Sequence, residues 1–183
     1  DILLNEVDID KAVNFVNTSI TDLLKGKYPI TDFVTSKTLK GTYKGEKLTT
    51  TKDGKKGEKG TWPWDDVDCS IAHVKLCQRM KERDPGNAPQ SNDRIPYTTV
   101  EKNDPKNKLL QGEKIEHVDH IKEQKLKIDY MFYLTNQIKN PTVQFLEHLI
   151  DNPDAMFKEA QMIETNRKLG NVSMLNYVNV KPK

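Results

Sequence analysis

The sequence lacks any long apolar run. Nowhere in its 183 residues is there a stretch close to the roughly 18 to 20 apolar residues that a membrane-spanning helix needs. The first residues also lack the basic and apolar blocks of a secretory signal peptide. We therefore expect a soluble, intracellular protein without a membrane partner. Because the chain begins without Met and in the middle of a pattern, we also expect it to be part of a longer protein.

Cysteine is scarce as well, since the chain has only Cys69 and Cys77. On one predicted helix their spacing corresponds to about 12 Å, which is too far for a disulfide. This excludes the disulfide framework of a small secreted domain and fits a reducing compartment. With 35% apolar residues and a mean hydropathy of −0.76, the chain is polar but still able to bury a core.

No large net charge of either sign is present. The formal net charge is +2, so any binding to a polyanion has to come from local clustering. Residues 37–60 hold eight lysines and three acidic residues, and they carry +5 while the rest of the chain carries −3. Their five glycines and the lack of an apolar cluster predict a mobile surface loop, which Trp62 and Trp64 would pin to the body. A solvated loop is the common interpretation of such lysines, and phosphate binding is the alternative.

Apolar residues recur at helical spacing in several segments. They predict helices over residues 8–25, 71–83, 129–150 and 154–169. We expect Asp8 to cap the first helix and Gly26 to end it, and Asp68 or Ser70 to cap the second. Pro141 should kink or divide the third.

Two segments of β-branched and apolar residues predict strands, over residues 30–36 and 94–100. Pro96 should place the second strand at an edge or at a bulge, because proline cannot donate to a strand ladder. With four or five helices and two or three short strands, the predicted fold class is a mainly helical α+β unit.

Familiar catalytic motifs are missing from the sequence. It contains no Walker sequence, no Gly-x-Ser-x-Gly and no His-Glu-x-x-His. Asp65, Asp66 and Asp68 form a carboxylate cluster, which we interpret as serving the N-terminal dipole of the following helix. No catalytic residue is therefore predicted.

One group of potential metal ligands needs weighing. Cys69, His73 and Cys77 are spaced by four on one predicted helical face, and His117 and His120 follow later. Thiolates and imidazoles bind zinc, but paired zinc ligands are usually about two to four residues apart, with a second pair far away. A cysteine is more often a small buried hydrophobe. No metal site is predicted, and a zinc-stabilised interaction domain stays an alternative hypothesis.

Arginine is rare but clustered. The chain has only four arginines: Arg79, Arg83, Arg94 and Arg167. The first three fall within 16 residues around a turn rich in Pro, Gly and Asn. Guanidinium groups bind phosphate through paired N–H donors, so these residues are a candidate grip on a nucleic-acid backbone. Ion pairs with Glu82, Asp84 and Asp93 are an equally good interpretation.

Three motifs in a fixed order carry a resemblance to a known family. Residues 34–39 read Val-Thr-Ser-Lys-Thr-Leu. Residues 72–97 contain Ala-His-Val, Arg-Met-x-x-Arg-Asp-Pro-Gly and Asp-Arg-Ile-Pro-Tyr. Residues 128–141 read Ile-Asp-Tyr-x-x-Tyr-Leu-x-x-Gln-Ile-x-x-Pro. Together they resemble the thumb region of family B DNA polymerases, in particular the delta-like enzymes of large double-stranded DNA viruses.

The resemblance implies a division of the chain. Residues 1–150 would form a thumb subdomain, and residues 151–183 a C-terminal helical extension and tail. The basic segment 41–60 looks like an insertion between motifs that lie closer together in cellular relatives. The family's palm carboxylates, in Tyr-x-Asp-Thr-Asp and Asp-x-x-Ser-Leu-Tyr-Pro motifs, are absent from this sequence, so this chain should not polymerise alone. Two cysteines cannot build the two Cys-rich metal motifs of the cellular delta enzymes, which favours a viral enzyme.

The implied function is to hold the primer-template duplex for a DNA-directed DNA polymerase during replication. Such a grip uses phosphate and minor-groove contacts and does not read sequence. The expected DNA-binding residues are Lys37, Lys40, Lys44, Arg79, Arg83 and Arg94. Tyr97, Tyr130 and Tyr133 are expected to pack rather than to stack on bases.

The expected partners are the palm and fingers of the parent polymerase and duplex DNA, and a sliding clamp or processivity factor is a further candidate. No cofactor is expected in this chain, and Mg²⁺ should belong to the palm. The expected location is a viral replication site or the nucleus of the infected host. The alternative from another class is a stand-alone duplex-DNA-binding protein, or the small subunit of a split polymerase.

Overall fold

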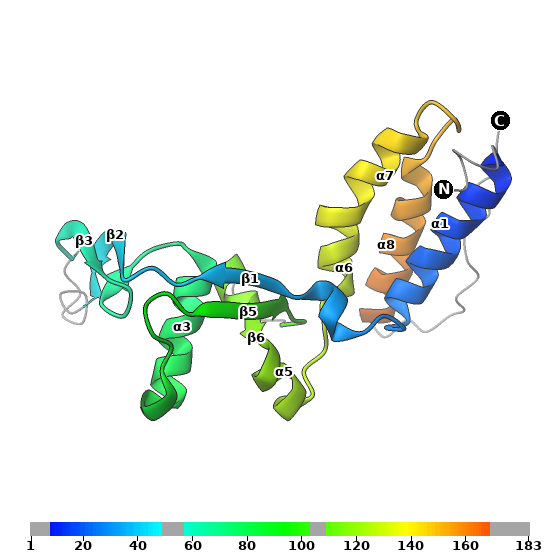
Figure 1. The fold of residues 1–183 in the computed structure, drawn as a ribbon. Coiled ribbons are helices and arrows are strands. Elements are labelled where there is room, and N and C mark those ends of the chain that lie inside the picture. The colour runs from blue at the N-terminus through cyan, green and yellow to red at the C-terminus, as the bar shows by residue number, and fades with distance from the viewer. Residues whose placement is uncertain (1–7, 49–56, 103–108, 169–183) are drawn as a thin grey trace. The chain divides into compact units, whose positions relative to one another are not determined.

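The computed structural model describes residues 8–48, 57–102 and 109–168, which form two compact units. One unit combines residues 1–29 with 129–183, and the other comprises residues 30–128 (Figure 1). Within the described ranges, no helix has both the length and the apolar character needed to cross a membrane.

The first unit begins with helix α1, Ile9–Leu24, as predicted. The carboxylate of Asp8 accepts a hydrogen bond from the Lys11 N–H at 2.9 Å and so caps the helix. After the helix, Gly26 has a φ of +69°, a left-handed conformation that favours glycine. A side chain there would also meet the ring of Tyr130. Both predicted ends of this helix are confirmed.

The other helices of this unit follow residue 129. Helix α6, Tyr130–Tyr133, continues into a π-helical turn, Leu134–Ile138 (η4), and then into α7, Lys139–Leu146. The π turn ends three residues before Pro141, which lies in the first turn of α7, has no N–H to donate, and crowds the preceding turn with its ring. Pro141 therefore interrupts the regular helix, as predicted. The last helix, α8, spans Asp154–Lys168.

Helix α8 contacts both α1 and α7, and α1 also contacts α6. The core of this unit consists of apolar side chains from all four helices and the turn before α8. The buried residues include Ala12, Val13, Ile20, Leu23, Tyr133, Leu134, Leu146, Ile150, Met156, Phe157 and Ala160. The predicted packing role of Tyr133 is confirmed by its exposure of 4%.

The second unit contains a three-stranded antiparallel sheet in the order β1-β5-β6. Its strands are β1, Thr35–Thr38, β5, Arg94–Thr99, and β6, Ile115–His117. The predicted strand at β5 is confirmed, but β5 is central and not at an edge. Pro96 is tolerated because β6 pairs only with Tyr97–Thr99, so Pro96 has a strand neighbour on one side alone.

The strand predicted over residues 30–36 is partly wrong. Residues Ile30–Phe33 form a short 3-10 helix (η2) that buries Phe33, and the strand β1 starts only at Thr35. Pro29 precedes this turn, and the carbonyl of Thr31 accepts the Val34 N–H at 3.4 Å. Local turn formation thus takes the place of the first half of the predicted strand.

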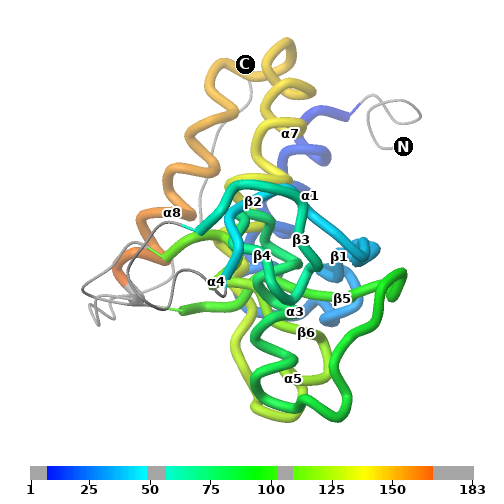
Figure 2. Tube along the Cα trace, turned by 90° about the vertical axis from the view of Figure 1, so that its left-hand side faces the viewer, coloured from blue at the N-terminus to red at the C-terminus, as the bar shows by residue number. Residues whose placement is uncertain are grey.

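The prediction of a mobile loop over residues 37–60 is also wrong for the residues that the structure describes. Strands β2, Thr42–Lys47, and β3, Lys59–Pro63, pair with each other, and β4, Val67–Asp68, pairs with the other edge of β2. Figure 2 shows these three strands together. Residues 49–56 lie outside the described ranges. The composition is misleading here because a single aromatic residue, Tyr43, supplies the buried side chain of β2.

Helix α3, Ala72–Arg83, ends as predicted, but its start differs. Ile71 is the N-cap and makes no side-chain capping hydrogen bond, so the predicted caps Asp68 and Ser70 are wrong. Asp68 instead pairs with Lys75. At the other end, Asp84 accepts the Gly86 and Asn87 N–H groups and opens the 3-10 turn η3, Pro85–Asn87.

Three short elements between residues 109 and 128 complete the unit: α4, Gln111–Lys114, β6, and α5, Val118–Gln124. Helix α3 contacts both α4 and β6. The core lies between this helix and the strands, and Tyr97 packs against it, as predicted. The buried residues of this core are Leu39, Tyr43, Trp64, Val67, Val74, Leu76, Cys77, Ile95 and Ile115.

The described residues therefore form the predicted α+β structure, with short strands in two small sheets. The division into a thumb over 1–150 and an extension over 151–183 stays a prediction. The compact units of the structure divide the chain elsewhere, near residues 29 and 128.

Candidate nucleic-acid interface

Four of the predicted DNA-binding residues lie at one end of the β1-β5 pair or in the next strand, β2. Lys37 is in β1, Lys40 in the turn after it, Lys44 in β2, and Arg94 is the first residue of β5. All four are exposed, and their side chains have no hydrogen-bond or ion-pair partner within the described ranges. Such cations are accessible to an external anion.

These four residues share an end of the sheet rather than a face. Arg94 is directly opposite Thr38 in the ladder, whereas Lys37 is opposite Ile95. Because side chains alternate along a strand, Lys37 and Arg94 point to opposite faces of the sheet. Lys44 follows the buried Tyr43 and points away from the core.

The backbone that carries Lys37 and Lys40 is fixed by several hydrogen bonds. Leu39 donates to the Asp93 carbonyl at 2.9 Å and accepts from the Asn92 N–H at 2.7 Å. The Lys40 N–H donates to the Tyr43 hydroxyl oxygen at 2.8 Å. The Gly41 carbonyl accepts from the Trp64 N–H at 3.1 Å. Every residue from 39 to 41 is thus anchored through its backbone.

His73 of α3 contacts the side chain of Tyr43, which holds this turn. Its Nε2 is 3.1 Å from the Tyr43 Oη, and the two rings meet edge to face. Burial lowers the pKa of His73, and the positive charge of Lys37 lowers it further. Burial also raises the pKa of Tyr43. Neutral His73 can accept the Tyr43 O–H while the Tyr43 oxygen accepts the Lys40 N–H, so all three groups are satisfied.

Arg79 and Arg83 have a different environment, because each donates hydrogen bonds to acceptors inside the unit. Arg79 donates to the carbonyls of Gly112 and Ile115 at 2.6 and 2.7 Å. Arg83 donates to both carboxylate oxygens of Glu116, at 3.1 and 2.8 Å. The predicted alternative partners of Arg83, Asp84 and Asp93, are wrong.

Glu116 is a buried charged residue of this region that the sequence does not reveal. Its side chain is 3% exposed and lies against three cations: Arg83, Lys102 at 2.6 Å and Arg79 at 3.6 Å. Burial alone would raise the pKa of Glu116, but the hydrogen bonds from Lys102 and Arg83 outweigh it, so the pKa is lowered. The sequence around Glu116 does not indicate this cluster, because Glu116 is a single acid in a three-residue strand and its partners are distant in the sequence.

The acidic cluster before α3 ties the helix to the β3–β4 connection. Asp65 pairs with Lys81 at 2.6 Å, and Gln78 donates to the carbonyls of Trp64 and Val67 at 2.8 and 2.7 Å. The predicted role of these carboxylates at the N-terminus of α3 is therefore wrong, because they pair with lysines instead.

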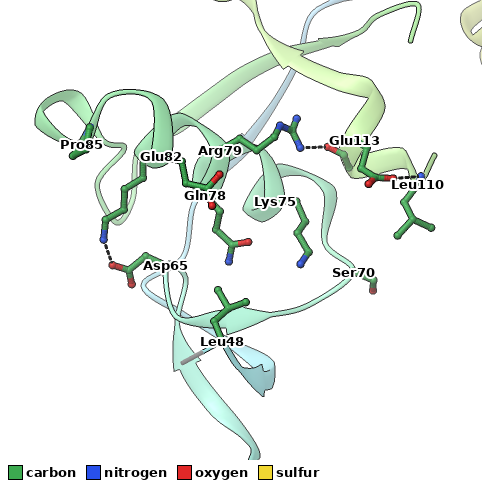
Figure 3. Close-up of a pocket in the computed structure, with 12 residues that line it drawn as sticks. Leu48, Asp65, Ser70, Lys75, Gln78, Arg79, Glu82, Pro85, Leu110 and Glu113 are labelled. Carbon is green, nitrogen blue, oxygen red and sulfur yellow. Dashed lines mark hydrogen bonds and ion pairs between the residues drawn. The ribbon is translucent and has the colours of Figure 1, made fainter. Parts of the chain in front are cut away.

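Next to these contacts is a hollow of about 660 Å³ that runs along α3 (Figure 3). Lysines, carboxylates and leucines line it together, and this mixture indicates no single ligand class.

The two cysteines are free, and only Cys77 lies in the helix. Burial raises the pKa of Cys77 to about 12, so this thiol is a packing group and not a thiolate ligand. Across residues 8–48, 57–102 and 109–168, no group of three or more His, Cys, Asp or Glu side chains is placed to hold a metal ion.

Comparison with known proteins identifies the family. The family model described as DNA polymerase family B matches residues 66–149. The "DNA polymerase" of Pyramimonas orientalis virus is 44% identical over 147 residues, which are 80% of this chain and 10% of that protein. The chain belongs to DNA polymerase family B.

Two further relatives of this family broaden the comparison. The "DNA polymerase" of Acanthamoeba polyphaga mimivirus is 37% identical over 97% of this chain and 9% of its own length. The "DNA polymerase delta catalytic subunit" of Glycine max is 30% identical over 82% of this chain and 12% of its own length. The predicted likeness to delta-like and giant-virus polymerases is confirmed. The chain spans about a tenth of the length of these relatives.

Proposed function

We propose that this chain is the thumb region of a DNA-directed DNA polymerase and that it holds duplex DNA through its phosphates during replication. The observation that carries the proposal is the set of exposed cations at one end of the β1-β5 pair. Lys37, Lys40, Lys44 and Arg94 have no acidic side-chain partner among the described residues. A polymerase has to hold every product sequence equally, so contacts to phosphates suit this role better than contacts to base edges.

The neighbouring acid, Asp93, makes no ion pair with these cations among the described residues. The Asp93 carboxylate accepts the Gln90 N–H at 2.7 Å and so helps to form the turn before β5. The fixed backbone from residue 39 to 41 lowers the entropy that is lost when the adjacent lysines bind a phosphate. At this end of the sheet, a duplex can contact Lys37 on one face and Arg94 on the other.

Arg79 and Arg83 would contribute in a less direct way. Glu116 faces three cations, and Glu82 and Glu113 also act on Arg79, so acidic and basic groups are balanced in this cluster. We therefore assign both arginines to holding β6 against α3, and so to the fold that presents the exposed cations.

The remaining parts of the enzyme are proposed from the relatives' names and from the resemblance. The palm and fingers of the parent polymerase would be direct partners, and the palm would hold the Mg²⁺ ions that assist nucleotidyl transfer. A sliding clamp is a further candidate partner. The place of action would be a viral replication site or the nucleus of the infected host.

A DNA-binding titration with this 183-residue chain tests the proposal. We expect weak binding to primer-template duplexes with little sequence preference and no nucleotide incorporation. The logarithm of the affinity should fall linearly with the logarithm of the salt concentration, with a slope of about −0.9 for each phosphate neutralised.

The paired substitution Lys37→Ala with Lys40→Ala should weaken binding and make the slope shallower by about 0.9 for each phosphate that is no longer neutralised. The matched control is Lys122→Ala with Lys127→Ala, which removes two exposed lysines away from this end of the sheet. A tight complex that is insensitive to salt, or equal effects of the two pairs, would contradict the proposal.

A further inference from the structure

Tyr43 links the basic turn to helix α3. Its hydroxyl oxygen accepts the Lys40 N–H at 2.8 Å and lies 3.1 Å from His73 Nε2. Its ring is 8% exposed and belongs to the core of the unit. A single side chain thus connects β2, the turn after β1 and the helix.

We propose that Tyr43 is a positioning residue that holds Lys40 in the orientation for binding a DNA phosphate. His73 supports it by accepting the hydrogen bond from the Tyr43 hydroxyl. This inference rests on the proposed function, because it concerns the same basic turn. The chain of hydrogen bonds runs from the Lys40 N–H to the Tyr43 oxygen, and from the Tyr43 O–H to neutral His73.

The physical reason is preorganisation. Lysine is a flexible cation on a long side chain, and binding a phosphate fixes both the side chain and the backbone that carries it. A backbone that is already fixed reduces this cost. The neighbouring backbone bonds hold residues 39 and 41, so the Tyr43 hydroxyl supplies the anchor for the residue between them.

The test uses Tyr43→Phe, which keeps the buried ring and removes only the hydroxyl. The probe is a fluorescent primer-template duplex at low salt, bound to the 183-residue chain. We expect the affinity to fall roughly two- to tenfold, the range of a single net hydrogen bond. Tyr28→Phe is the matched control, because Tyr28 is exposed in the other unit, and it should leave the affinity unchanged.

A double-mutant cycle with Lys40→Ala separates positioning from a general structural role. Lys40→Ala removes the charge but keeps the backbone N–H. If Tyr43 acts through Lys40, Tyr43→Phe should have little further effect on affinity once the Lys40 charge is gone. Equal losses in both backgrounds would overturn the inference.

Substitutions of His73 provide a second route to the same answer, including the case in which Tyr43→Phe fails to fold. His73→Leu removes the acceptor of the Tyr43 O–H and should weaken DNA binding in the same direction. His73→Gln restores an acceptor and should recover most of the affinity. Equal affinities of the two variants would overturn the assignment of His73.

The outcomes also distinguish this inference from the proposed function. If Lys40→Ala leaves DNA affinity unchanged, the proposed interface itself is wrong at this residue. If Lys40→Ala weakens binding but Tyr43→Phe does not, the interface stands and the positioning role of Tyr43 is wrong.

Discussion

Arg83 donates hydrogen bonds to both carboxylate oxygens of Glu116, whose side chain is 3% exposed. The two residues are far apart in the sequence, and their contact joins the end of α3 to strand β6. Lys102 donates to the same carboxylate at 2.6 Å. The unit thus stabilises one buried negative charge with guanidinium and ammonium groups that are themselves partly exposed.

The first prediction concerns Arg83→Ala. We expect the free energy of unfolding to fall by about 1 to 3 kcal/mol, because a buried carboxylate loses one of its charged partners. The affinity for duplex DNA should change much less. Thermal unfolding and a DNA titration on the same variant measure both effects.

Arg94→Ala is the matched control for Arg83→Ala and should show the reverse pattern, with reduced DNA affinity and an almost unchanged melting temperature. Arg94 is exposed, and its side chain has no partner among the described residues. If Arg83→Ala weakens DNA binding as strongly as Arg94→Ala does, then Arg83 is a direct contact.

The second prediction concerns pH. The pKa of Glu116 is lowered from its usual value of 4.5, so the folded protein binds this proton less readily than the unfolded chain. The stabilisation from this carboxylate is therefore complete above pH 4.5 and is lost as the pH falls through the lowered pKa. Denaturant unfolding across this range should show the loss in the parent chain. In Glu116→Gln the stability should be lower at neutral pH and should approach that of the parent chain in acid.

Asp65 provides the control for this titration. Its hydrogen bond with Lys81 also lowers its pKa, so Asp65→Asn should remove a part of the acid dependence too. Because Asp65 is exposed, that part should be smaller and more sensitive to salt. A stability difference between parent and Glu116→Gln that does not change with pH would contradict the assignment.

The sequence predicts well those elements whose signals are local. The helix α1 has its apolar spacing, its cap Asp8 and its terminal Gly26 within one continuous segment, and all three are confirmed. The end of α3 and the strand β5 are similar cases. The π turn ends only three residues before Pro141, so this interruption also has a local signal.

The features that were missed depend on partners distant in the sequence. Strand β2 has little apolar character, and its one buried aromatic residue, Tyr43, contacts His73 of α3. Asp68 pairs with Lys75 and not with the helix end. Glu116 pairs with two arginines of α3 and with Lys102, which follows β5. The assignment of the charged residues to a DNA-binding site stays a prediction. The internal acceptors of Arg79 and Arg83, which separate these two from the exposed cations, could not be predicted from spacing.

The third prediction tests the close packing of the second sheet at Gly45. A side-chain carbon at this position would lie 2.7 Å from Val67 Cγ2 and would also collide with the backbone carbonyl of Asp68. Gly45→Ala should therefore push β4 away from β2 and cost about 1 to 3 kcal/mol of stability. Gly86→Ala is the control, because a carbon there meets only the Asp84 carboxylate at 3.4 Å. Thermal unfolding of the two variants should differ clearly, and equal melting temperatures would contradict the observed β2–β4 pairing.

The last prediction concerns the basic segment as a whole. Deleting residues 45–59 removes half of β2, and with it the pairs Glu46–Asp68 and Lys47–Val67 that hold β4. Val67 is fully buried, so uncovering it alone should cost roughly 2 kcal/mol. A clear fall in melting temperature is therefore expected in circular dichroism. A deletion confined to residues 50–55 keeps both strands and is the control, and it should change stability little because shortening a connection alters the closure entropy only slowly. If both deletions leave the melting temperature unchanged, strands β2 and β3 do not support the core, and the segment acts as the solvated loop that its composition suggests.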